Sequence, residues 1–255
     1  MKLTNNSGLP EAFVRAVKND PYSKGDADFS VTELLKPPRA RALEIKYKDE
    51  IIEDARDRVW AVLGQSVHYI LMQSARDGDI VERRFSSEFL GMKVAGQIDL
   101  LETDTKTLSD WKVTKAYPFT KKGGSGLKDE WVAQLNMQLE LLRGNGLDAT
   151  RLQIVGILKD FDEAKTKVGS KRFELGYPKA EIVAVEMPMW DRERTQAFIK
   201  QRVRAHHTAA RELPLCGAEE TWGGRRCARY CPASAFCDQY QSALKTGILT
   251  QGAIT

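Results

Sequence analysis

The sequence predicts an α/β protein in which a central mixed β-sheet is flanked by helices. Two apolar runs, residues 94–101 and 107–114, lie on either side of a short polar turn, which is typical of a β-hairpin. Residues 129–143 carry apolar side chains at helical spacing, and residues 151–158 form the nearly continuous apolar run of a buried strand. All four cysteines lie after Pro214, so a small C-terminal cysteine-bound metal module is predicted beside this core.

The length of the chain sets the expected domain organisation. A chain of 255 residues suffices for one sizeable core and a small appended module. We assign residues 1–212 to the main domain, with a helical N-terminal part, and residues 213–255 to the cysteine module. No apolar run reaches the roughly 20 residues of a membrane span and the N-terminus lacks a signal-peptide core, so we expect a cytoplasmic protein without membrane contact. The net charge of +4 is compatible with an anionic partner.

Helices are expected before the hairpin. Residues 11–18 form a short helix, and a capping box at Ser30 opens a second helix that the Pro37-Pro38 pair ends. A longer helix is expected over residues 49–76, where apolar residues keep a 3.6-residue period. It carries His68. A lone helical histidine is more often a packed or capping residue than a metal ligand, so the residues alone leave its role open.

A strand is predicted over residues 81–90, with a turn beginning at Gly91. Glu82 and Glu88 share one face of this strand because strand side chains alternate. Charges on an edge strand commonly protect it against aggregation. We therefore interpret both glutamates as edge-strand charges rather than ligands.

The hairpin carries acidic residues whose placement follows from its register. If Asp104 and Thr105 form a two-residue loop, Asp99 lies opposite Asp110, and Lys112 shares their face. Facing carboxylates repel, so a fold keeps them together only with a shared proton, a basic partner or a bound cation. A divalent cation with a lysine beside it is the equipment for metal-assisted phosphodiester hydrolysis. The alternative at this point is a solvent-facing hairpin with ordinary surface contacts.

Polar side chains follow the hairpin in the loop at residues 115–128 and on the helix predicted after it. Gln134 and Gln138 lie four residues apart on one face of the predicted helix, where they contact phosphate or are simply solvated. The loop before this helix holds four lysines among glycines: Lys115, Lys121, Lys122 and Lys128. Such a loop either holds DNA phosphates or is a solvated, flexible segment.

The remaining regular elements come after the apolar strand. A strand is predicted over residues 181–187, and a helix over residues 191–212 with Asp191 as its N-cap. His206 and His207 are adjacent and point apart on this helix. We therefore expect both to be surface residues.

The cysteines have the spacing of a metal site. They are Cys216, Cys227, Cys231 and Cys237. Four thiolates can bind one Zn²⁺ or one 4Fe-4S cluster. Zinc modules usually contain a C-x-x-C pair and this chain has none, which mildly favours iron and sulfur, with zinc as the alternative. The module is expected to present Arg225, Arg226 and Arg229 towards DNA.

The motifs taken in order resemble a known family. G-x-x-D at residues 96–99, D-x-K at 110–112 and Q-x-x-x-Q at 134–138 are similar to motifs of the RecB-like branch of the PD-(D/E)XK nuclease superfamily, which includes phage exonucleases and CRISPR adaptation nucleases. G-x-x-x-H at residues 64–68 matches the branch's histidine motif. The resemblance extends from about Ser30 to the C-terminal cysteines. Gln138 stands where the family's helix motif usually has tyrosine.

This resemblance implies a restriction-endonuclease-like core and a metal-dependent DNA nuclease, expected to be an exonuclease of DNA processing, recombination or repair. Asp99, Asp110 and His68 would bind Mg²⁺ or Mn²⁺, Lys112 would be the catalytic lysine, and Gln134 would support the site. Several RecB-like nucleases carry a 4Fe-4S cluster on C-terminal cysteines, usually with one cysteine from far upstream, whereas all four are C-terminal here.

Two other functions are compatible with the same residues. The first is a nucleic-acid-binding module that keeps the fold without turnover. The second is a nuclease subunit that works only with protein partners in a larger recombination or CRISPR-adaptation complex. In every case DNA is the expected ligand.

Overall fold

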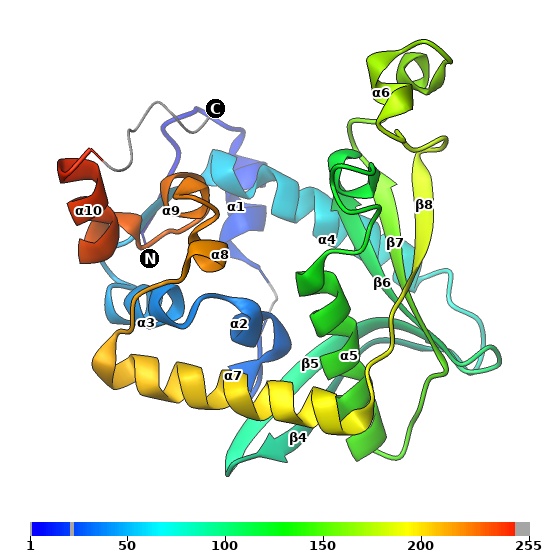
Figure 1. The fold of residues 1–255 in the computed structure, drawn as a ribbon, viewed down its shortest axis with the longest axis horizontal. Helices are drawn as coiled ribbons and strands as arrows, with labels where there is room; N and C mark the ends of the chain where they lie inside the picture. Colours follow the sequence, from blue (N-terminus) through cyan, green and yellow to red (C-terminus); the bar gives the residue numbers. More distant parts are fainter. Residues whose placement is uncertain (1, 21–22, 248–255) are drawn as a thin grey trace. The chain divides into compact units, whose positions relative to one another are not determined.

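The computed structural model describes residues 2–20 and 23–247, and the chain divides into two compact units (Figure 1). The sheet unit comprises Lys24–Thr32 and Trp60–Ile199. The cysteine unit comprises Met1–Ser23, Glu33–Val59 and Lys200–Thr255. The division therefore does not fall at the predicted boundary, residue 212, because N-terminal segments belong to the same unit as the cysteines.

The sheet unit is built on a six-stranded mixed sheet, which confirms the predicted fold class. The strand order is β2-β5-β6-β7-β8, with β4 paired to the other edge of β5. β2–β5 and β6–β7 are parallel, whereas β4–β5, β5–β6 and β7–β8 are antiparallel. The strands are β2 Phe29–Ser30, β4 Ile80–Phe89, β5 Met92–Glu102, β6 Thr107–Thr114, β7 Arg151–Leu158 and β8 Ile182–Met187.

The middle of β5 lies at a fork in the sheet. On one edge β5 pairs with β2 at Val94 and Ala95, and with β6 only from Leu100 to Glu102. Between these contacts, the ladders of the described residues pair Gly96 to Ile98 with β4 alone. Gln138 fills the fork, because its Nε2 donates to the Gln97 carbonyl at 2.8 Å. The fork therefore separates β5 from β6 just where the hairpin carries its acidic residues.

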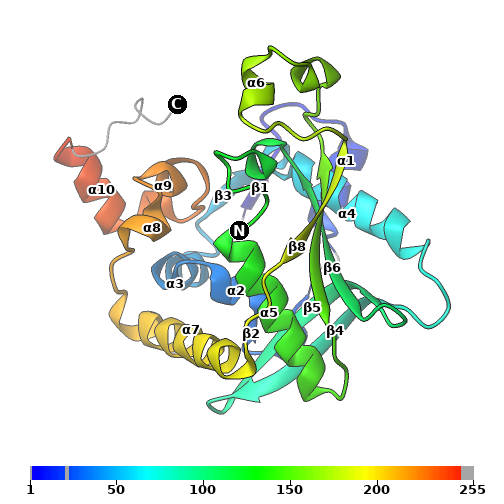
Figure 2. The same cartoon turned by 45° about the vertical axis from the view of Figure 1, so that its right-hand side comes forward.

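Helix α5, Asp129–Gly144, covers the sheet beside this fork, as Figures 1 and 2 show. Its Leu135, Leu139 and Leu142 are fully buried, as the apolar period predicted. Gly96 permits the close approach of the helix, since a Cβ there would lie 2.9 Å from the side chains of Leu141 and Val31. The glycine of the G-x-x-D motif is therefore required by packing.

The predicted helix over residues 49–76 is wrong in its first part. Strand β3, Ile52–Asp54, pairs there with β1, Lys2–Thr4, and helix α4 runs only over Val59–Met72. The Asp54 carboxylate accepts from the backbone of Arg56 at 3.1 Å, which fixes a turn where the helix was expected.

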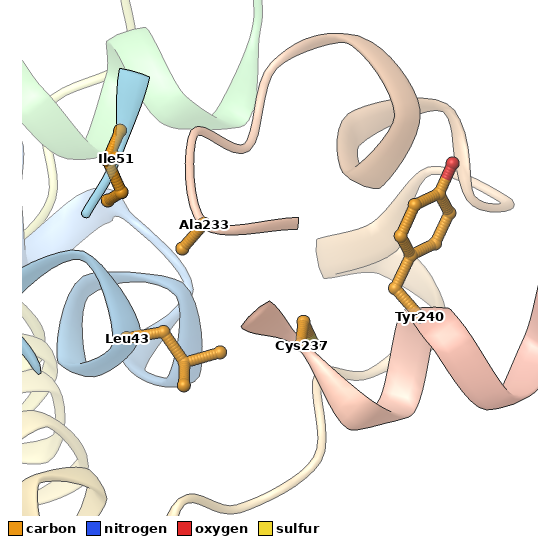
Figure 3. Close-up of a cluster of buried hydrophobic side chains, with 5 residues drawn as sticks. All are labelled: Leu43, Ile51, Ala233, Cys237 and Tyr240. Atoms are coloured by element: carbon orange, nitrogen blue, oxygen red, sulfur yellow. The ribbon is translucent and has the colours of Figure 1, made fainter. Parts of the chain in front are cut away.

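The cysteine unit contains mainly short helices around a small apolar cluster. Figure 3 shows this cluster, Leu43, Ile51, Ala233, Cys237 and Tyr240. Its helices are α1 Glu11–Lys18, α3 Pro38–Lys46, α8 Ala218–Thr221, α9 Arg225–Arg229 and α10 Asp238–Lys245. Helix α3 was not predicted, because Pro38 was interpreted as the end of the preceding helix. Pro38 is instead the first residue of α3, where a backbone N–H has no partner within the helix and its absence does not destabilise the helix.

Two helices contribute several residues to each unit, α2 Val31–Leu35 and α7 Arg192–Glu212, whereas α4 contributes only Val59 to the cysteine unit. The Asp191 side chain accepts from Arg194 N at 2.6 Å, which confirms the predicted cap of α7. His206 was expected at the surface but is buried, with Nε2 3.2 Å from the Leu34 carbonyl. Burial and the charge of Arg202 lower the pKa of His206 to about 4, so this histidine is neutral.

Shorter elements complete the chain. They are helix α6 Lys171–Glu174 and the 3₁₀ turns Ala55–Arg58, Tyr117–Phe119, Glu163–Thr166 and Ser234–Phe236. Among the described residues, none of the helices combines the length and the apolar composition needed to cross a membrane.

Candidate active site

The β5–β6 hairpin brings the two predicted acidic residues together. Leu100 pairs with Ser109 and Glu102 with Thr107, so the next step of the same ladder sets Asp99 opposite Asp110. This register is the predicted one. Both side chains are buried, Asp99 with 8% and Asp110 with 1% of its surface exposed.

Each carboxylate is held by a different kind of group. Asp99 Oδ2 accepts from the backbone N–H of Trp111 at 2.7 Å, which substitutes for strand pairing at the fork. Asp110 lies 2.5 Å from Lys112 Nζ, through Oδ2, and accepts from Gln134 Nε2 at 2.5 Å, through Oδ1. Gln134 Oε1 in turn accepts from Lys112 Nζ at 3.1 Å. The fold thus closes a ring of an acid, a lysine and an amide.

Helix α4 adds His68 to this group. Its Nε2 lies 3.1 Å from the Trp111 carbonyl, and its Nδ1 lies 3.1 Å from Glu82 Oε1 and 3.7 Å from Asp99 Oδ1. The ring also packs edge-on against the Trp111 ring, with centroids 5.5 Å apart. The histidine is therefore oriented by three neighbours rather than left in solvent.

Glu82 also belongs to this group, contrary to its interpretation as an edge-strand charge. Its backbone has φ +46°, a region that non-glycine residues rarely adopt, and the β4–β5 ladder is interrupted there. Its carboxylate accepts from Gln97 Nε2 and contacts His68. Strained backbone of this kind is concentrated at functional sites.

The sequence did contain a signal for Glu82. Phe89 pairs with Met92, so Leu90 and Gly91 form a two-residue hairpin loop. Counting back from that loop sets Glu82 opposite Asp99. The sequence reasoning assigned the turn to Gly91 but did not extend the register of β4.

The charges of the site shift the pKa values of its members. Burial and the negative charge of Asp110 raise the pKa of Asp99 to about 7. Burial alone would lower the pKa of His68, but the hydrogen bond with Glu82 and the charge of Asp99 raise it. Burial likewise opposes the ionisation of Glu82, yet His68 and Gln97 lower its pKa. The site accumulates negative charge that only partly finds positive partners.

The donor set fits a hard divalent cation. Ligand atoms of His68, Glu82 and Asp99 all lie within 4.8 Å of one another. Neighbouring ligands of an octahedral Mg²⁺ lie about 3 Å apart when its bonds are about 2.1 Å, which is close to the separation of His68 Nδ1 from Glu82 Oε1. Asp110 Oδ2 is buried and lies 2.5 Å from the Lys112 ammonium, but among the described residues it has no hydrogen-bond partner of good geometry. A carboxylate oxygen has two lone pairs, so this atom could accept a cation beside Lys112.

Residues 21–238 match the family model of the PD-(D/E)XK nuclease superfamily. The chain belongs to this superfamily. No curated protein matches the chain.

Two solved structures align with this chain at low sequence identity. The crystal structure of SSO0001 has a TM-score of 0.58 and 18% identity, and the alignment covers 89% of this chain and 94% of that one. A phage-related exonuclease from Haemophilus somnus 129PT aligns with a TM-score of 0.35 and 14% identity, over 78% of this chain and 79% of that one. Only the first score is high enough to indicate a shared fold.

The predicted DNA-contacting residues of this nuclease-superfamily chain fall into three groups. Lys115, Lys121, Lys122, Arg225 and Arg229 are exposed. Lys128 and Arg226 are partly buried over aromatic rings, 4.8 Å above Trp131 and 3.9 Å above Trp222 respectively. Gln138 is only 2% exposed, so its predicted contact with DNA is inconsistent with the structure, where it supports the fork of the sheet.

The four cysteines all lie in the cysteine unit but do not form a closed site. Among the described residues, no three cysteine sulfurs lie within 4.8 Å of one another, whereas one tetrahedral zinc would hold them about 3.8 Å apart. Burial raises the pKa of Cys216 to about 12 and that of Cys231 to about 11. Arg39 Nε lies 3.4 Å from the sulfur of the buried Cys237. The predicted cysteine metal module is therefore not confirmed.

Proposed function

We propose that the protein is a metal-dependent deoxyribonuclease of the RecB-like branch, acting as an exonuclease on phosphodiester bonds. The observation that carries this proposal is the convergence of Asp99, Asp110 and Lys112 from two neighbouring strands, with His68 against them. Membership of the nuclease superfamily supports it. A cytoplasmic location is part of this proposal.

The roles of the residues follow from their positions. His68, Glu82, Asp99 and Asp110 would hold Mg²⁺ or Mn²⁺. When bound, such a cation supplies Lewis-acid charge at a phosphate oxygen and makes water more acidic. The Lys112 ammonium would position the attacking water and stabilise negative charge that develops on the phosphate. Gln134 would keep Asp110 and Lys112 in place, because it binds both.

Exposed basic residues would hold the DNA backbone. Lys115 follows directly on β6, the strand that carries Lys112, and Lys121 and Lys122 lie in the loop after it. Contacts of this type are independent of base sequence and weaken as salt is added. Arg225 and Arg229 in the cysteine unit would contribute further phosphate contacts.

We further propose that the four cysteines bind a 4Fe-4S cluster, with zinc as the alternative. The absence of a C-x-x-C pair among four C-terminal cysteines favours a cluster over a single zinc ion, since zinc modules usually contain such a pair. Visible absorbance of anaerobically purified protein together with metal analysis tests this. Colourless protein with stoichiometric zinc supports the alternative, and protein without either metal contradicts both.

A nuclease assay tests the main proposal. Purified protein with Mg²⁺ or Mn²⁺ should degrade DNA, and Asp110→Asn should abolish degradation without loss of fold. Asp104→Asn, in the exposed turn of the same hairpin, is the matched control and should remain active. Protein inert on single-stranded, duplex and nicked DNA would overturn the enzyme assignment. DNA binding in EDTA without cleavage in metal would then indicate a binding module, and activity restored by host extract would indicate required protein partners.

A further inference from the structure

Helix α4 carries apolar side chains that the sheet unit does not bury. None of its described residues is buried, although the helix is rich in apolar residues. Trp60, Leu63, Val67 and Ile70 recur at helical spacing and share one side. Trp60 is 57% exposed and Ile70 is 66% exposed. His68 points from another side of the same helix into the candidate active site.

A lysine lies directly over the most exposed ring of this side. Lys159 Nζ is 3.7 Å from the centroid of the Trp60 ring. Lys159 follows β7 immediately, and its backbone N–H donates to the Thr114 carbonyl at 2.9 Å. The next residue along β6 is the exposed Lys115. Burial and the neighbouring charge of Lys115 lower the pKa of Lys159. Positive charge is therefore concentrated beside the tryptophan.

One carboxylate offsets only part of this charge. Asp160 acts electrostatically on Lys159 and accepts from the Ala116 backbone N–H at 2.6 Å, which leaves two lysines against one carboxylate. Two ammonium groups and one indole thus form an aromatic and basic surface. The buried centre of a protein interface is usually depleted of lysine, whereas a strand of nucleic acid needs cations for its phosphates and rings for its bases.

We propose that Trp60, with Lys159 and Lys115, is a stacking site for a base of single-stranded DNA. This proposal rests on the proposed function and specifies its substrate. Lys159 holds one face of the indole in place, and the exposed remainder receives a base. Stacking of this kind tolerates any base, because every base has a π-face. A paired duplex offers no free base face at this position, so the site favours an unpaired strand.

The distance from the stacking site to the catalytic residues could be spanned by a few nucleotides of single-stranded DNA. Trp60 precedes His68 by eight residues, which is about 12 Å along an α-helix. Lys115 follows Lys112 by three residues, which is about 10 Å along a strand. The stacked base would therefore lie a few nucleotides from the phosphate undergoing hydrolysis.

Binding measured without turnover tests the site. Fluorescence anisotropy of labelled oligothymidine in EDTA should show that Trp60→Ala weakens binding about 10-fold. Trp60→Phe should restore most of the affinity, and the affinity for duplex DNA should change less. Tyr69→Ala is the matched control, because Tyr69 is equally exposed on α4 but points to the opposite side. Equal affinity of wild type and Trp60→Ala for oligothymidine would overturn the proposal.

An abasic strand separates stacking from other causes. Wild type should bind an abasic oligomer of equal length about 10-fold more weakly than oligothymidine, and Trp60→Ala should lose nothing further. Lys159→Ala should weaken the binding of both oligomers. It should also reduce the salt dependence of the affinity by the amount expected for about one phosphate contact. If Trp60→Ala also bound the abasic oligomer more weakly than wild type does, the effect of the substitution would come from the packing of α4 or from the loss of a partner contact. This result would contradict stacking.

The two proposals can fail separately. Photo-crosslinking of 5-iododeoxyuridine DNA to intact wild-type protein should label a peptide that contains Trp60, whether or not the protein cleaves DNA. Cleavage of DNA with no crosslink at Trp60 would leave the nuclease assignment in place and overturn the stacking site. A crosslink without cleavage would support the stacking site and overturn the nuclease.

Discussion

The two candidate metal-binding regions differ in how closely the fold brings their donor atoms together. In the sheet unit, His68, Glu82 and Asp99 have ligand atoms within 4.8 Å of one another and are tied by hydrogen bonds to Trp111 and Gln97. In the cysteine unit, no three described sulfurs approach as closely, and three of the four thiols are only partly buried.

The difference follows from the elements that carry the donors. Strand register fixes side chains from distant parts of the sequence to within an ångström or so, since a slip of one residue would turn every side chain to the other face. The cysteines lie on short helices and turns, such as α9 with five residues, which have little structure of their own to hold them. The first site is positioned by the sheet, whereas the elements that carry the cysteines do not by themselves bring the four sulfurs together.

Removal of bound metal should therefore have its largest effect in the cysteine unit. Loss of a thiolate-bound group is expected to destabilise residues 216–245 by several kcal/mol, since structural zinc contributes about 10 kcal/mol or more in small modules. Hydrogen exchange should show lost protection in α10 after chelation, while α5 and β5 keep theirs. Unchanged exchange in α10 after the metal has been removed would show that the cysteines have no structural metal.

A lysine substitution tests whether the sheet site works as a catalytic unit. Lys112→Ala should reduce kcat by about 10²- to 10⁴-fold, the range for loss of a positioned catalytic group. The fold should persist, because Gln134 still binds Asp110. Lys106→Ala, in the exposed turn of the same hairpin, should be neutral. Equal kcat values for the two variants would remove Lys112 from the mechanism.

The two units should also respond to pH in opposite directions. The pKa of Asp99 is raised to about 7 in the folded, EDTA-treated protein. Between about pH 4 and pH 7, Asp99 therefore holds a proton in the folded state that it has already released in the unfolded chain. Stability of the sheet unit should therefore fall as pH rises from about 4 to 7, by at most about 4 kcal/mol. The raised pKa of His68 acts in the same direction, because its contribution is lost as pH rises.

His206 of the cysteine unit has the reverse sign. Its pKa is lowered to about 4, so between its ordinary value near 6.5 and pH 4 the unfolded chain binds the extra proton and stability falls as pH falls. Hydrogen exchange resolved by segment should show both trends in EDTA. Asp99→Asn should flatten the trend of the sheet unit alone. Mg²⁺ should stabilise wild type more at pH 8 than at pH 5, and equal stabilisation would contradict a carboxylate site.

The parts of the fold governed by local rules were predictable. The hairpin turn has four residues, 103–106, rather than the predicted two, but it has the same centre, so the predicted register of Asp99 and Asp110 holds. The apolar run predicted β7 with its observed bounds. The apolar period of α5 predicted the burial of Val132, Leu135, Leu139 and Leu142. In each case one short-range rule, loop length or periodicity, was enough.

The parts that depended on tertiary context were missed. Gln138 shares a helix face with Gln134, but the fork of the sheet turns it into a buried support for Gln97. His206 is buried only because the Leu34 carbonyl lies against it. Neither neighbour is close in sequence, so neither environment could be inferred from local pattern. The wrong helix start before Val59 has the same cause, since β3 exists through its pairing with β1.

Glu82 tests whether the sheet site has a fourth ligand beyond the three that the sequence predicted. Its control, Glu88, lies on the same strand. Glu82→Gln should weaken binding of Mn²⁺ to the sheet site by at least about 10- to 100-fold, because losing a carboxylate ligand should cost no less than losing a group that only orients a ligand. Glu88→Gln, on the same face but exposed, should leave binding unchanged. Isothermal titration calorimetry with Mn²⁺ measures the affinity of each variant, with Trp60 and the cysteines left unchanged. If the two variants bind Mn²⁺ equally, the left-handed backbone at Glu82 serves the twist of β4 alone, and the site reduces to the three ligands that the sequence predicted.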